Sequence, residues 1–95
     1  MKPNSDNINL DEKRCKRLQF RANHRGIKEM DIILGSYADV HIFDLDRAEL
    51  NAFERLLEEN DRDLLQWFTG ELVFPHDDLR RLFEKISSFA NNRMS

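Results

Sequence analysis

The stretch LDRAELNAFERLLEEN, residues 45–60, carries the clearest helix signal in the chain. Asp46 is a favourable N-cap, and Glu49 follows three residues later, as in a capping box. Leu45 and Leu50 occupy the two positions of a hydrophobic staple. Apolar residues then recur at helical spacing, at Leu50, Phe53, Leu56 and Leu57. The segment therefore predicts an amphipathic helix that ends near residue 60.

Two more helices are expected before this segment. The first runs from about Asp11 to Asn23, with Cys15, Leu18 and Ala22 on one narrow apolar stripe. A second helix follows the break at Gly26, where glycine suits a left-handed cap or a tight turn. Its apolar positions are Ile27, Met30, Leu34 and Tyr37, with Gly35 interrupting it late.

The segment 39–44 alternates polar and apolar residues as a strand would. A lone strand has no pairing partner in this chain, so we interpret it as an extended linker.

Two further helices are expected after residue 60. A short one covers about 61–69 and ends at Gly70, and the last begins near Asp77. Five helices joined by short loops, with only three Gly and two Pro, predict an all-α fold, a compact five-helix antiparallel bundle. We assign residues 10–91 to one domain, 1–9 to a flexible polar arm and 92–95 to a flexible tail.

The size and composition of the chain limit its class. Its 95 residues suit one domain, and 35% charged residues with 40% hydrophobic ones are typical of a soluble globular protein. No apolar run approaches the roughly 20 residues of a membrane span, and the first residues do not resemble a signal or transit peptide. We therefore expect a cytoplasmic protein without direct membrane insertion. The single cysteine, Cys15, is expected to be a buried apolar side chain.

No catalytic or metal site is expected from the motifs. His24, His41 and His76 are scattered, without a second His or Cys at ligand spacing. The paired carboxylates flank helix ends, where acids act as caps and dipole partners. We find no glycine-rich phosphate loop and no nucleophile with its base.

Charge is unevenly distributed along the sequence. Residues 1–30 hold eight basic and four acidic side chains, whereas residues 31–95 hold seven basic and fourteen acidic ones. One expected helix is strongly basic, with an interleaved Phe20, so nucleic-acid binding is an alternative function. A generic helical interaction module is another. The acidic balance of the whole chain argues against nucleic acid as a partner, and none is expected. The basic residues of this helix are Lys13, Arg14, Lys16, Arg17 and Arg21.

The most unusual stretch is Arg25-Gly26-Ile27-Lys28-Glu29-Met30-Asp31. On structural grounds alone, Gly26 is a cap glycine, and Glu29 and Asp31 favour the positive end of the following helix. A functional interpretation is a rigid corner. Glycine lets another backbone approach closely, and Arg25 and Glu29 offer charged hydrogen bonds to a partner.

This stretch resembles the Arg-Gly-x-x-Glu signature of the succinate dehydrogenase flavinylation factors, which are small bacterial and mitochondrial proteins. The resemblance covers roughly residues 13–75. Two departures are His24, where many members carry a second Arg, and Arg62, where a Pro is common. Other matching residues are Arg17-Leu18, Arg21, Leu34-Gly35, Tyr37-Ala38-Asp39, Phe53, Leu56-Leu57, Asp61, Asp63-Leu64, Trp67 and Thr69-Gly70.

The resemblance implies a five-helix bundle and a role as an assembly factor. Such a factor binds the flavoprotein subunit of succinate dehydrogenase, with fumarate reductase a possible second client, and promotes covalent attachment of FAD to a histidine of that subunit. It implies that the chain is not an enzyme, that it binds no cofactor tightly because FAD belongs to the partner, and that it is a monomer when free. An organellar homologue would lie in the mitochondrial matrix. The partner-binding residues carried over are Arg25, Gly26, Glu29 and Asp31, with Arg21, His24 and Trp67 as weaker candidates.

Overall fold

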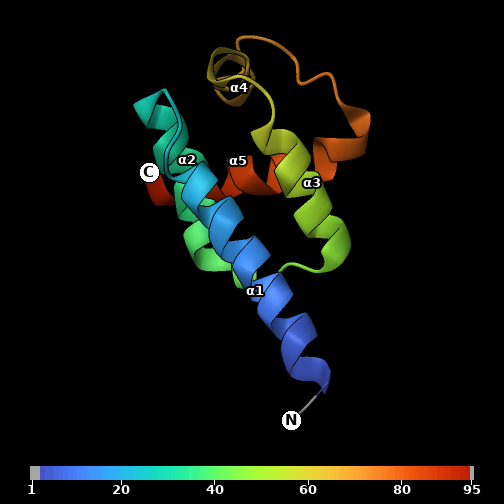
Figure 1. Cartoon of the computed structure of the whole chain (residues 1–95). Helices are drawn as coiled ribbons and strands as arrows, with labels where there is room; N and C mark the ends of the chain where they lie inside the picture. Colours follow the sequence, from blue (N-terminus) through green and yellow to red (C-terminus); the bar gives the residue numbers. More distant parts are fainter. Residues whose placement is uncertain (1–2, 95) are drawn as a thin grey trace.

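Helices make up almost all of the regular structure in the chain (Figure 1). The computed structural model describes the backbone of residues 3–94 and the side chains of residues 11–92. Residues 1, 2 and 95, at the ends of the predicted arm and tail, lie outside the described residues. The elements are α1 (Pro3–Ala22), α2 (Lys28–His41), the 3-10 turn η1 (Ile42–Asp44), α3 (Arg47–Leu57), α4 (Asp61–Phe68), the 3-10 turn η2 (Asp77–Leu79) and α5 (Arg80–Met94).

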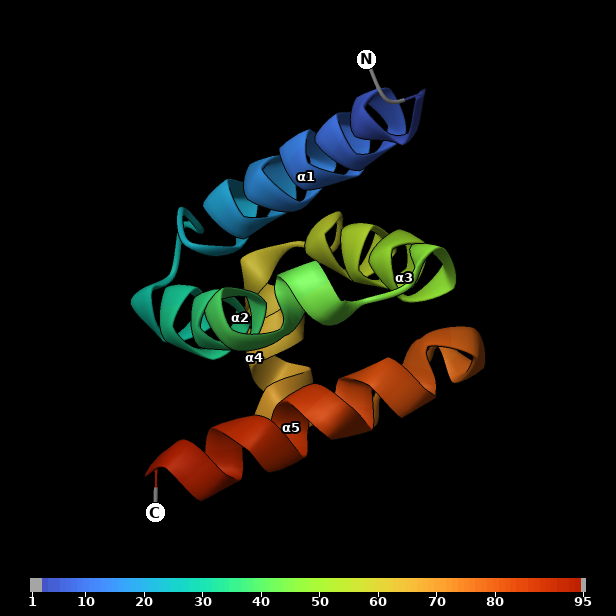
Figure 2. The same cartoon turned by 90° about the horizontal axis from the view of Figure 1, so that it is seen from below.

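The helices form layers, which are best seen along the view of Figure 2. α1 and α5 lie on opposite sides of a central layer formed by α2 and α3, and α4 crosses one end of that layer. The predicted all-α bundle is confirmed. Within residues 3–94, none of the helices combines the length and the apolar character of a membrane span.

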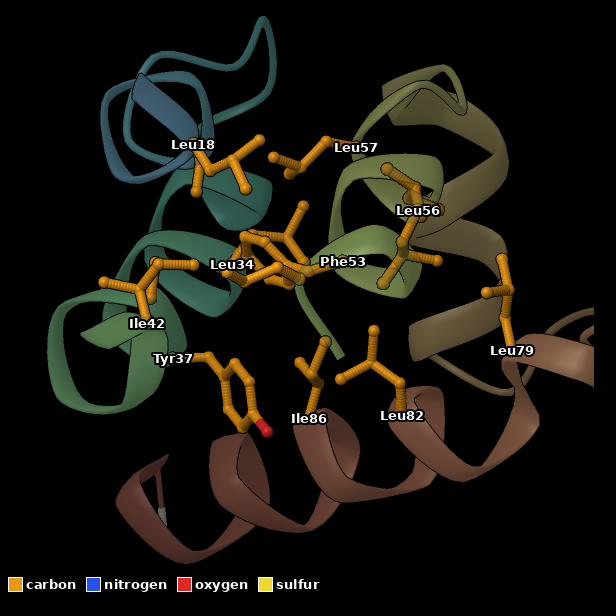
Figure 3. Close-up of a cluster of buried hydrophobic side chains, with 14 of the residues drawn as sticks. Leu18, Leu34, Tyr37, Ile42, Phe53, Leu56, Leu57, Leu79, Leu82 and Ile86 are labelled. Carbon is orange, nitrogen blue, oxygen red and sulfur yellow. The ribbon is translucent and has the colours of Figure 1, made fainter. Parts of the chain in front are cut away.

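The core is formed by one stripe from each helix of the bundle (Figure 3). Phe53 of α3 is fully buried at its centre, between Leu34 of α2 and Ile86 of α5. Leu18 of α1 closes the core from the other side of the central layer. Burying each such side chain stabilises the fold by about 1.5–3 kcal/mol. The apolar stripes predicted for α1, α2 and α3 thus meet in a single core, to which α5 adds Leu82 and Ile86.

The start of α3 has the predicted capping box. The Glu49 backbone N–H donates to Asp46 Oδ1 at 2.8 Å, and the Asp46 backbone N–H donates to Glu49 Oε1 at 2.9 Å. Two orphan donors of the first turn are satisfied in this way, which explains why α3 begins where it does.

The prediction of an extended linker at 39–44 is wrong. α2 continues to His41, and η1 extends the helical path to Asp44. The alternating pattern is misleading because the buried residues recur at every fourth position: Leu34, Ala38 and Ile42 are all fully buried on one face of the helix. The intervening Val40 stays half exposed, as a helix requires and a half-buried strand does not.

Both terminal helices differ from the predicted bounds. α1 begins at Pro3 rather than near Asp11, and proline is well tolerated in a first helical turn. α5 begins at Arg80, because the residues from Asp77 form the turn η2 instead of its first turn, and it continues to Met94. The flexibility of the predicted arm and tail stays a prediction.

Gly35 of α2 lies against Asn23, the residue that follows α1. A Cβ atom on this buried residue would lie 2.3 Å from Asn23 Oδ1 and 2.8 Å from Asn23 Cγ. The Asn23 side chain is held there, because its Nδ2 donates to the Gln19 carbonyl at 2.9 Å and to Asp39 Oδ1 at 3.1 Å. Gly35 therefore allows the contact between the two helices rather than interrupting α2.

This contact predicts opposite effects of Gly35→Ala in two backgrounds. In the wild-type chain, the gain of roughly 1 kcal/mol in helix propensity is cancelled or exceeded by displacement of Asn23. In an Asn23→Ala background, where the obstructing atoms are gone, the same substitution is expected to stabilise by about 1 kcal/mol. Urea unfolding of the four proteins measures both values. Equal effects in the two backgrounds would exclude the proposed contact.

Cys15 is a core residue, as predicted, with 5% of its surface exposed. Burial is the main cause of its raised pKa, and the nearby Asp11 carboxylate adds to the effect. Its Sγ donates to the Ile42 carbonyl at 3.4 Å.

A buried thiol with a raised pKa is a poor nucleophile at neutral pH. We expect an aromatic disulfide reagent to modify Cys15 only as the chain unfolds, with a rate that rises through the urea transition. Complete modification of the folded chain within seconds would show that α1 opens at this point.

Candidate functional site

The corner between α1 and α2 is tied to the junction of α3 and α4 by the side chain of Arg25. Its Nε donates to Asp61 Oδ1 at 2.7 Å. Its two terminal nitrogens donate to the Leu57 carbonyl at 2.5 Å and to the Glu59 carbonyl at 2.6 Å. These carbonyls lie at the C-terminal end of α3, where backbone oxygens lack helical partners and attract a cation. One guanidinium group thus joins three elements.

The Asp61 carboxylate holds the backbone of the same corner. Its Oδ2 accepts from the Gly26 backbone N–H at 2.6 Å, while its Oδ1 accepts from Arg25. The backbone N–H of Arg25 donates to the carboxylate of Asp31, which closes the corner against the first turns of α2. The Arg25 and Asp61 side chains are only 11% and 17% exposed, so this ion pair is weakly screened by solvent.

Gly26 itself is exposed at the surface of the corner. A Cβ added there would lie 3.1 Å from Asp61 Oδ2, which is a tight contact. Its backbone is not in the left-handed region, so of the two expected roles the left-handed cap is wrong and the tight turn between helices remains; among the described residues only Gly70 has a positive φ, of 81°. Glycine at position 26 therefore leaves room beside Asp61 and a bare backbone facing solvent.

Glu29 lies in the first turn of α2, exposed and directed along a groove that α4 and α5 also line. Among the described side chains it has no hydrogen-bond or ion-pair partner. Arg25 and Glu29 thus differ, although both were predicted to meet a partner: Arg25 is used inside the chain, and Glu29 remains available.

Two weaker candidates flank the corner: Arg21 lies in the last turn of α1, and His24 lies just beyond the end of that helix. Arg21 is half exposed and lies 3.7 Å from Glu54 Oε2, a long ion pair. His24 is exposed; its Nδ1 lies 2.7 Å from the Phe20 carbonyl, and its ring stacks on that of Phe20 with centroids 3.9 Å apart.

Trp67 contacts the connector between α4 and η2. Its ring meets those of Phe74 and His76 edge-on, with centroids 5.1 and 5.6 Å apart. His76 connects this group of rings with the corner, because its Nε2 lies 3.2 Å from Glu59 Oε2. Trp67 is half buried and packs against the core, and its role in partner binding stays a prediction.

Sequence reasoning missed the central role of Asp61. By its position in the sequence, this residue is one of the paired carboxylates that flank helix ends and act as caps and dipole partners. Arg25 and Asp61 are 36 positions apart, and no local spacing connects them. The sequence did carry one signal, since Asp61 is among the residues that resemble those of the flavinylation factors.

The basic helix considered for nucleic-acid binding is partly neutralised within the chain. Arg14 donates to Glu54 Oε1 at 2.8 Å and to Asn51 Oδ1 at 2.6 Å, and Arg21 lies beside the same glutamate. On this helix, three basic residues have no acidic partner among the described side chains: Lys13, Lys16 and Arg17. Within the same part of the chain, no group of three or more His, Cys, Asp or Glu is placed to hold a metal ion.

The corner predicts a large stability difference between two arginines. Arg25→Ala removes three hydrogen bonds and strands Asp61, so we expect a loss of about 3 kcal/mol in the free energy of unfolding. Arg47→Ala is the matched control, because Arg47 forms only an exposed pair with Asp11 at 3.7 Å, and its loss is expected to cost roughly 0.5 kcal/mol or less. Urea unfolding of both variants measures the contrast, and similar losses would contradict the assigned role of Arg25.

Comparison with known proteins places the chain in a family. Residues 16–90 match the family described as "flavinator of succinate dehydrogenase". The "FAD assembly factor SdhE" of Acetobacter pasteurianus is 39% identical over 75 residues, which are 75% of this chain and 69% of that protein. The mitochondrial "succinate dehydrogenase assembly factor 2" of Caenorhabditis briggsae is 30% identical over 87 residues, 88% of this chain and 70% of that protein. The protein of the same name from Aspergillus flavus is 38% identical over 55 residues, 58% of this chain but only 19% of the fungal one. The chain therefore belongs to the family of succinate dehydrogenase flavinators, or assembly factors.

Proposed function

We propose that this chain binds the flavoprotein subunit of succinate dehydrogenase and promotes covalent attachment of FAD to it. Membership of the flavinator family supports the role in assembly, and the name of the Acetobacter relative connects that role with FAD. The observation that carries the proposal is the corner at Arg25 and Gly26, which is held rigid from inside and presents a bare backbone to solvent.

Rigidity at the corner favours binding because less conformational entropy is lost on association. In this proposal Arg25 acts indirectly: it fixes the backbone of Gly26 and the start of α2. Gly26 is the contact residue, since the absence of a Cβ lets a partner loop approach closely. Glu29, which has no partner among the described side chains, supplies a carboxylate one turn away. Asp31 supports the corner through its hydrogen bond with the Arg25 backbone.

The flavin bond would form on the partner, between its own FAD and its own histidine. This chain would hold the partner in an arrangement that brings the two groups together, which is a gain from orientation rather than from a catalytic group of its own. We accordingly propose a non-enzymatic helper that binds no cofactor tightly and acts as a monomer. Action on the fumarate reductase flavoprotein, and the location in the cytoplasm or the mitochondrial matrix, stay predictions.

The direct test is in-gel flavin fluorescence of the denatured flavoprotein subunit. Cells lacking this chain are expected to lose most of the covalent flavin, and wild-type chain should restore it. Gly26→Arg should fail to restore it, because the new side chain covers the bare backbone and crowds Asp61, whose Oδ2 would lie 3.1 Å from its Cβ.

Ser88→Arg is the matched control, since it places the same side chain at an exposed position of α5 away from the corner. It is expected to restore flavinylation fully, and circular dichroism should confirm that both variants are folded. Normal covalent flavin in cells without the chain would refute the proposed function.

A further inference from the structure

An apolar groove lies next to the corner, between α2, α4 and α5. Its volume is about 230 Å³. Ile32 of α2 forms one wall and is 45% exposed, although it is a large aliphatic residue. Leu65 and Phe68 of α4 form the second wall and are only partly buried. The full lining is Glu29, Ile32, Ile33, Leu65, Phe68, Thr69, Ser87, Ala90 and Asn91.

The groove has a charged end as well as an apolar floor. Glu29 belongs to its lining and has no partner among the described side chains. Thr69 cannot serve as that partner, since its hydroxyl donates to the Gln66 carbonyl at 3.3 Å. An unpaired carboxylate beside an apolar surface is complementary to a segment with a cation next to a large apolar side chain.

The size of the groove limits its occupant. Sites that enclose a whole small-molecule ligand typically measure roughly 300–1,000 Å³, so this one is too small for a dinucleotide cofactor. A single side chain suits it better. A lipid chain is disfavoured because the groove is short and ends at a carboxylate, which anionic headgroups would repel.

We propose that this groove binds a segment of the flavoprotein subunit in which a Lys or Arg adjoins a large apolar side chain. The apolar side chain inserts between Ile32 and Phe68, and the cation pairs with Glu29. This inference rests on the proposed function and deepens it, because it adds a second anchor beside the corner. Gly26 and Glu29 lie within one turn of each other at the start of α2, so one partner surface covers both.

The first experiment measures binding of the purified, FAD-loaded flavoprotein subunit to variants of the whole chain. Ile32→Ser is expected to weaken binding about tenfold, because it removes the exposed wall of the groove. Glu29→Gln should weaken it roughly threefold and make the affinity less sensitive to salt, since one ion pair is lost.

Two matched controls separate the groove from the rest of the surface. Val40→Ser removes another half-exposed aliphatic side chain from α2, outside the groove. Glu84→Gln neutralises an exposed carboxylate of α5 that does not line the groove. Both are expected to bind as the wild type does, and thermal unfolding of all four variants checks that each is folded.

The second experiment identifies the occupant. A photoreactive phenylalanine analogue at Thr69, on the exposed rim, is expected to crosslink to a flavoprotein peptide with a Lys or Arg within two or three residues of a large apolar side chain. The same analogue at position 40 should not label that peptide. Crosslinking to a second copy of this chain, or to a peptide without a cation, would overturn the inference.

The outcomes also separate the two proposals. Wild-type affinity in Ile32→Ser and Glu29→Gln, together with loss of binding in Gly26→Arg, would overturn the groove and leave the proposed function standing. A wild-type chain that does not bind the flavoprotein would overturn both.

Discussion

The hydrogen bonds and the ion pair of the Arg25 guanidinium group hold the corner in its geometry. The group joins the corner between α1 and α2 to the end of α3 and the start of α4, through two backbone carbonyls and the Asp61 carboxylate. Removing either charge would leave the other partly buried without compensation, which is more costly than losing an exposed pair. The geometry of the corner, and its connection to the start of α4, therefore depend strongly on this ion pair.

This arrangement divides the work between neighbouring residues. Arg25, Asp31 and Asp61 satisfy one another inside the fold, so they hold the corner in shape. Gly26 and Glu29 remain at the surface. The Arg-Gly-x-x-Glu signature therefore combines a residue that holds the corner in shape with residues that are placed to contact a partner. A substitution at Arg25 would impair function by changing the shape of the corner rather than by removing a contact with the partner.

Local signals predicted most of the fold. The capping box of Asp46 and Glu49, the apolar stripe of α3 and the glycine at the end of α4 all involve residues within one or two turns, where spacing determines contact. Spacing was ambiguous at 39–44, because residues at 34, 38 and 42 decide that segment and an alternating pattern conceals them. The pairing of Arg25 with Asp61, and the use of Gly35 against Asn23, depend on tertiary contacts that no local pattern records. The groove beside Glu29 was missed for the same reason, since three helices build it.

The most direct test of partner binding at the corner is amide hydrogen exchange of the whole chain, measured alone and in complex with the purified flavoprotein subunit. Binding is expected to slow exchange in residues 26–33, at the corner and the start of α2. It is also expected to slow exchange in residues 65–69 and 87–91, which line the groove together with α2. Exchange in the basic segment 13–21 should change less. Protection confined to 13–21, with no change at the corner or along the groove, would show that the partner does not bind at the corner held by Arg25.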